Sequence, residues 1–149
     1  MYQSGCNAYR QSAGNIVEDK GVVLIKLYDG ALRFLAIARR AIAESKPNIR
    51  GENISKVMAI INELECALDM EKGGELSAQL ASLYRFVMDK LTLANIKNDL
   101  MALGQAENIL QTLKEGFEGA ARSRNNSTGS AAMMTENRAP RQEGIRFAY

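Results

Sequence analysis

The sequence predicts an all-helical fold, and three observations support that prediction. The 149 residues include 46% apolar and 24% charged residues, a balance typical of one globular domain. Apolar side chains recur at spacings of three and four residues along four separate stretches. The breaks between these stretches are short, so consecutive helices are expected to be antiparallel neighbours. We therefore expect an antiparallel up-down-up-down four-helix bundle.

The central break is the pair Gly73–Gly74, which lies within the charged stretch 63–95. A glycine in a helix interior costs about 1 kcal/mol relative to alanine, so two adjacent glycines favour a turn. One of them is expected to adopt a positive φ and to close the preceding helix, which ends at Leu68–Met70. Glu75 then lies in the first turn of the next helix, where the helix dipole favours an acidic side chain. This segment is predicted to form a tight helical hairpin.

The other helix boundaries follow from capping residues and from proline. Asp19 is a suitable N-cap for the first helix. Pro47 disfavours a helical conformation at the residue before it, and the second helix is expected to begin at a cap on or beside Asn53. The third and fourth helices are separated by a turn at residues 97–99. The helices are expected at residues 21–43, about 54–70 and 75–96, and the fourth follows the turn with an apolar stripe from Leu103 to Phe117.

Both ends of the chain differ in composition from the bundle. Residues 1–18 contain few large apolar groups and are expected to form a short segment with at most one brief helix. After Arg122 the sequence is rich in Ser, Asn, Gly and Arg and has no helical periodicity. Residues 123–149 are therefore expected to be a flexible tail, and residues 1–122 to be the helical domain.

The composition argues against an enzyme. Histidine is absent, which removes the commonest general base and the commonest metal ligand. Acidic pairs such as Glu63 and Glu65 fit a solvated helix face, and Lys72 before two glycines lacks the remainder of a phosphate-binding loop. We expect no catalytic residues, no cofactor and no metal ion.

Charge and hydropathy predict a soluble cytoplasmic protein. The formal net charge of +2 is too small to indicate nucleic acid or an anionic membrane as a partner. The chain has no apolar run of about 18 residues for membrane insertion and no secretory signal pattern. Cys6 and Cys66 lack metal-binding spacing, and we expect two reduced thiols, with one disulfide as the alternative.

The first and third helices have more apolar surface than a bundle core requires. Two adjacent apolar stripes run along the first helix, and Tyr84 lies on the flank of the third. One explanation is that the N-terminal segment or a second copy of the protein covers this surface. The other is a groove for an amphipathic partner helix. The pattern alone favours neither explanation.

Two motifs in these helices carry a family resemblance. Residues 27–31 have the sequence LYDGA and are followed by RFL at 33–35, whereas residues 68–75 have the sequence LDMEKGGE. Leu83-Tyr84 and Ala94-Asn95 follow at matching spacings. With this order and spacing, the chain from about Tyr9 to Phe117 resembles the flagellar secretion chaperones of flagellin, the FliS family.

The resemblance implies a cytoplasmic export chaperone with an antiparallel helical bundle. Such a protein binds the C-terminal amphipathic segment of flagellin one to one, prevents its premature polymerisation and aids delivery to the gate of the flagellar type III export apparatus. It also implies that Tyr9 and Ile16 of the N-terminal segment cover part of the binding groove when cargo is absent. The groove residues expected from it are Leu24, Leu27, Tyr28, Phe34, Leu83, Tyr84 and Val87.

A structural or scaffold bundle without cargo is the alternative function. Such a bundle would self-associate through the same apolar surface and would appear as a dimer in solution. A weak homodimer is also compatible with the chaperone interpretation.

Overall fold

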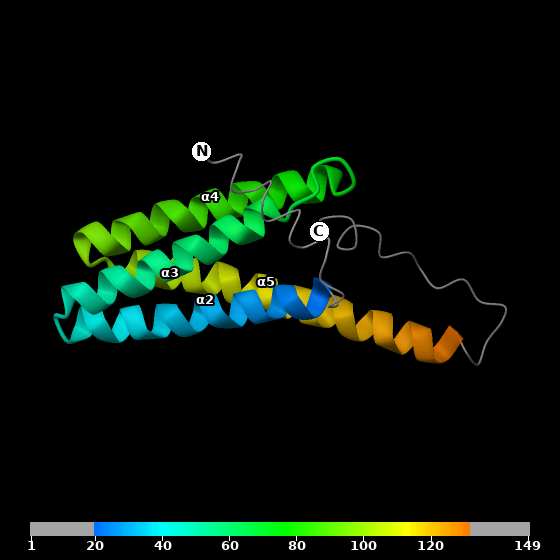
Figure 1. Ribbon diagram of the computed structural model, residues 1–149, viewed down its shortest axis with the longest axis horizontal. Helices are drawn as coiled ribbons and strands as arrows, with labels where there is room; N and C mark the ends of the chain where they lie inside the picture. Colours follow the sequence, from blue (N-terminus) through cyan, green and yellow to red (C-terminus); the bar gives the residue numbers. More distant parts are fainter. Residues whose placement is uncertain (1–19, 132–149) are drawn as a thin grey trace.

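The computed structural model describes residues 20–131, with side chains described for residues 20–127. Within this range consecutive helices run antiparallel, side by side along one long axis (Figure 1). α2 and α4 each pack against both α3 and α5, so the order around the bundle is α2, α3, α4, α5. This arrangement confirms the predicted all-α fold. The helices are α2 (Lys20–Ala43), α3 (Pro47–Cys66), α4 (Gly74–Lys97) and α5 (Leu100–Ala131).

The bundle core consists of one stripe of buried side chains on each helix. The stripes follow the three- and four-residue spacing that the sequence shows. Burying one large aliphatic or aromatic side chain contributes roughly 1.5–3 kcal/mol, so these stripes provide the main stabilising free energy. The largest apolar side chains that are completely enclosed are Tyr28, Leu35, Ile54, Val57, Ile61, Leu64, Tyr84, Val87, Leu91, Leu103 and Leu110.

The turn between α2 and α3 differs from the expected boundary. Ser45 adopts a positive φ of 56°, and the Lys46 N–H donates to the Ala41 carbonyl at 2.8 Å, which closes α2 in a Schellman motif. α3 then begins at Pro47 rather than near Asn53, because a proline in the first helical turn needs no N–H partner. Asn53 is inside the helix, where its Nδ2 donates to the Ile49 carbonyl at 2.8 Å.

The glycine pair lies at the predicted turn, but the details differ. α3 ends at Cys66, before Leu68–Met70, and the positive φ of 51° occurs at Gly74, the first residue of α4. The glycine therefore opens the second helix of the hairpin instead of closing the first. The Asp69 carboxylate stabilises this turn by accepting hydrogen bonds from the backbone N–H groups of Glu71 and Lys72.

α5 is longer than the sequence predicts. It begins after the predicted turn at residues 97–99, where the Asp99 carboxylate accepts a hydrogen bond from the Ala102 N–H at 3.0 Å and caps the helix. It continues past Arg122 to Ala131 and beyond the ends of the other helices (Figure 1). Residues 123–131 are thus helical rather than irregular.

Several sequence-based expectations concern residues that the structure does not describe. Asp19, the N-terminal segment and residues 132–149 lie outside the described residues. Cys66 is disulfide-bonded, which contradicts the expectation of a reduced thiol, and Cys6 lies outside the described residues. Within residues 20–131, no helix is both long enough and apolar enough to span a membrane.

We expect Gly74→Ala to lower the free energy of unfolding by about 1–2 kcal/mol, because a positive φ is unfavourable for a residue with a Cβ. A methyl group at this position would meet no atom within 4 Å, so the backbone alone accounts for the effect. Gly116→Ala in α5 is the matched control, also with no atom within 4 Å, and should be neutral or stabilising. Denaturant unfolding followed by circular dichroism measures both, and equal effects would contradict this explanation.

Candidate functional site

The expected groove residues are divided between the core and the surface. Leu27 and Phe34 are half-buried and pack against the core, and Leu83 is 36% exposed. Tyr9 and Ile16 lie outside the described residues. The other four side chains belong to the buried core: Leu24, Tyr28, Tyr84 and Val87.

Tyr28 and Tyr84 form a polar contact inside this core. Their hydroxyl oxygens are 2.5 Å apart, and either hydroxyl can donate the hydrogen bond. The Tyr28 ring also stacks on Phe117 of α5, with ring centroids 5.7 Å apart. Burial raises the pKa of both tyrosines, so both hydroxyls stay neutral at physiological pH. The pair links α2 to α4 across the centre of the bundle and is not part of a surface groove.

Each helix has two edges beside its buried stripe, and their positions follow from the helical repeat. We call the side chains one position before a buried residue in the sequence the leading edge of the helix. Those one position after a buried residue form the trailing edge. On α2, Phe34 on the leading edge lies beside α3, with Lys56 Nζ 5.2 Å from the centroid of its ring. Asp29 on the trailing edge pairs with Lys114 of α5 at 2.5 Å. The leading edge of α2 thus faces α3, and the trailing edge faces α5.

The edge between α2 and α3 is partly exposed and is apolar on its α2 side, whereas its α3 side also includes the ion pair between Lys56 and Glu52. Leu27, Phe34 and Ile37 lie on the leading edge of α2, and Ile37 is 41% exposed. Ile60 lies on the leading edge of α3, and a Cβ built on Gly30 would be 3.6 Å from its Cδ1, so the two helices approach closely there. We call this surface, formed by Leu27, Phe34, Ile37 and Ile60, the α2/α3 face.

A second apolar surface lies between α4 and α5. Asn95 on the trailing edge of α4 accepts a hydrogen bond from Arg50 of α3 at 3.2 Å, so the leading edge of α4 faces α5. Leu83 and Phe86 are on that leading edge, and Phe86 is 42% exposed. Ile109 on the leading edge of α5 is half-buried beside them. We call the surface formed by Leu83, Phe86, Lys90 and Ile109 the α4/α5 face.

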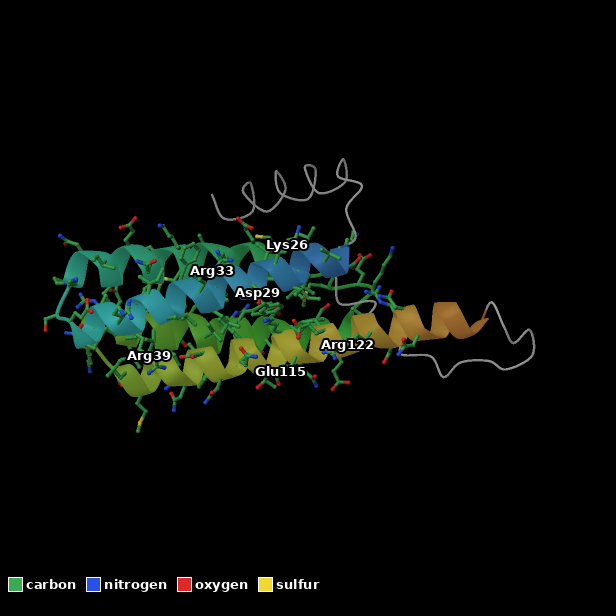
Figure 2. The ribbon with its side chains drawn as sticks, turned by 90° about the horizontal axis from the view of Figure 1, so that it is seen from below. Lys26, Asp29, Arg33, Arg39, Glu115 and Arg122 are labelled. Atoms are coloured by element: carbon green, nitrogen blue, oxygen red, sulfur yellow. The ribbon has the colours of Figure 1, made fainter. Side chains whose placement is uncertain are left out.

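Polar contacts join the helices along the two remaining edges. Between α2 and α5, Arg39 pairs with Glu107 at 2.6 Å, and the bond from Lys114 to the Asp29 carboxylate raises the pKa of the Lys114 ammonium. Figure 2 shows Asp29 and Arg39 among the charged side chains on this side of the bundle. Arg50 makes the polar contacts between α3 and α4. The apolar faces therefore alternate with polar edges around the bundle.

The structure brings Tyr28 and Tyr84 together inside the core, but it does not bring the partly exposed groove candidates together. Leu27 and Phe34 are on the α2/α3 face, whereas Leu83 is on the α4/α5 face, on the other side of the bundle. Sequence reasoning also missed Phe86 and Lys90. Their four-residue spacing was the available signal, and in the structure the Lys90 ammonium lies 5.1 Å from the centroid of the Phe86 ring. Within residues 20–131, no group of three or more acidic or cysteine side chains is placed to hold a metal ion.

We expect Tyr28→Phe to lower the free energy of unfolding by about 1–2 kcal/mol, because Tyr84 loses the buried hydroxyl that bonds to it. Tyr84→Phe removes the other half of the same bond. The double variant should therefore be less destabilised than the sum of the single variants, by about 0.5–1 kcal/mol. Urea unfolding of the four proteins measures this coupling, and strictly additive effects would show that the hydroxyl contact contributes nothing.

Comparison with known proteins places the chain in a family. The family model described as "Flagellar protein FliS" matches residues 2–124. The Flagellar secretion chaperone FliS of Salmonella typhimurium is 37% identical over 93 residues, covering 62% of this chain and 69% of that protein. The Bacillus subtilis protein of the same name is 31% identical over 121 residues, covering 81% and 89%. That of Campylobacter jejuni is 35% identical over 111 residues, covering 74% and 86%.

These matches confirm the resemblance seen in the two helical motifs. The names of the relatives describe chaperones rather than enzymes, in agreement with the expectation from composition. The family model also extends over all four helices, as far as residue 124 in α5. The chain belongs to the FliS family of flagellar secretion chaperones.

Proposed function

We propose that this protein binds the C-terminal amphipathic segment of flagellin in the cytoplasm, one copy to one copy. Binding prevents premature polymerisation and presents the subunit to the flagellar type III export apparatus. The observation that carries the proposal is the partly exposed α2/α3 face in a member of a chaperone family. This function needs no catalytic group, because the bundle only has to compete with other flagellin subunits for the apolar surface of the cargo segment.

The α2/α3 face has the properties that this competition requires. Leu27, Phe34 and Ile37 recur along one edge of α2, so they match an amphipathic helix laid along the bundle. The buried residues Leu24 and Tyr28 support this edge from beneath. A cargo segment that folds on binding covers a large surface at modest affinity per unit area. Such affinity suits a cargo that must be released at the export gate.

The N-terminal segment is proposed to compete with the cargo. Tyr9 and Ile16 would cover part of the apolar surface, so the cargo must displace them and its apparent affinity falls. Removal of residues 1–15 should therefore tighten binding of a flagellin C-terminal peptide in a calorimetric titration. Unchanged or weaker binding by the truncated protein would rule out the covering role.

The α2/α3 face is tested with Ile37→Glu, which places a charge on an exposed position of that face. We expect binding of a peptide from the last 40 or so residues of flagellin to weaken about tenfold, because the carboxylate would lose water on contact with apolar cargo. Ala36→Glu adds the same charge to the exposed trailing edge and should bind like the unmodified protein. Fluorescence anisotropy with labelled peptide measures both, and equal affinities would contradict the assignment.

A second assay separates cargo binding from self-association. Stoichiometric amounts of the protein should slow the seeded polymerisation of flagellin monomers, and Ile37→Glu should slow it less. A scaffold that self-associates would instead sediment as a dimer and leave polymerisation unchanged, which would overturn the proposal.

A further inference from the structure

The α4/α5 face has an uneven distribution of charge. On α5, the side chains that precede buried residues and face α4 are uncharged, and they include Gln105 and Ile109. The acidic side chains that form ion pairs on α5 lie on its trailing edge, where Glu107 pairs with Arg39 of α2. The edge of α5 that faces α4 therefore offers no carboxylate to a neighbouring cation.

The leading edge of α4 supplies one cation to this face. Leu83, Phe86 and Lys90 directly precede the buried residues of α4 at spacings of three and four, so they lie in line along about 10 Å of helix. Lys90 is half-buried, and its Nζ lies 5.1 Å from the centroid of the exposed Phe86 ring. None of the ion pairs in the described part of the chain includes Lys90.

The α2/α3 face provides an internal comparison. Lys56 lies over Phe34 in the same way, with its Nζ 5.2 Å from the ring centroid, but it also pairs with Glu52 at 3.3 Å. The charge of Lys56 is thus already balanced by its own helix. Among the described side chains, the Phe86 ring is the one group shown to attract the Lys90 ammonium, and a partner that covers Phe86 would also remove water from Lys90.

We infer that the α4/α5 face docks a helical part of the cargo that places a carboxylate beside Lys90 while its apolar side chains cover Leu83 and Phe86. The inference rests on the proposed function, because the occupant is the C-terminal segment of flagellin. An uncharged segment would leave the Lys90 ammonium partly dehydrated and without a counter-charge, which is unfavourable. Lys90 therefore selects cargo with an acidic residue next to its apolar stripe, and it favours binding in one register.

The test compares Lys90→Gln and Lys90→Glu with the unmodified full-length protein in binding the flagellin C-terminal peptide. At low salt we expect Lys90→Gln to bind about three- to tenfold more weakly and Lys90→Glu more weakly still, with the differences shrinking at about 1 M salt. Arg85→Gln is the matched control, because Arg85 is exposed on the trailing edge of the same helix. It should bind like the unmodified protein. Unchanged melting temperatures show that the variants fold.

The cargo side of the contact is identified with peptides in which each Asp or Glu is changed singly to Asn or Gln. One of these changes should weaken binding to the unmodified protein and have no further effect on Lys90→Gln. If the unmodified protein binds and Lys90→Glu binds equally well, the role of Lys90 is overturned while the proposed function stands. If the unmodified protein does not bind, the proposed function itself fails. A dimer that Lys90→Glu dissociates would assign the face to a second copy and also overturn the inference.

Discussion

The hydrogen bond between the hydroxyls of Tyr28 and Tyr84 constrains how α2 and α4 meet inside the bundle. It joins α2 to α4 across the middle of the bundle, and the Tyr28 ring stacks on Phe117 of α5. A buried hydroxyl without a partner would cost about 1–3 kcal/mol, so the two helices are held at the separation and rotation that keep this contact. That rotation is consistent with the edges of α2 and α4 that face their neighbours.

The side chains on those edges form two kinds of surface, polar edges with ion pairs and hydrogen bonds, and apolar edges. Arg39 with Glu107 and Asp29 with Lys114 join α2 to α5, and Arg50 joins α3 to α4. The other two edges contain Phe34 and Phe86, each with a lysine over its ring. Polar contacts therefore join the helices along two edges of the bundle, and in our proposal the two apolar faces bind the partner. This separation fits the proposed binding and release of one flagellin segment.

The sequence predicted the helices well because apolar spacing, Gly73–Gly74 and the turn at 97–99 are local signals. It misplaced the start of α3, since Pro47 indicates a break between helices in the sequence although it is the first residue of α3. It could not separate the groove candidates into buried and exposed residues, because core and edge residues share one apolar arc. Tyr84 is enclosed, for example, and Leu83 beside it is exposed. Which edge faces which helix depends on contacts between residues distant in sequence, such as Arg39 with Glu107. The pairing of Phe86 with Lys90 bears on partner binding because their edge of α4 faces α5, which the sequence does not show.

We propose that cargo binding results from burial of apolar surface coupled to folding of the cargo. The most direct test of this proposal is calorimetric titration of the protein with the flagellin C-terminal peptide at several temperatures. We expect a one-to-one complex and a large negative change in heat capacity, because apolar burial gives that signature. A complex whose binding enthalpy does not vary with temperature, or no complex at all, would contradict it.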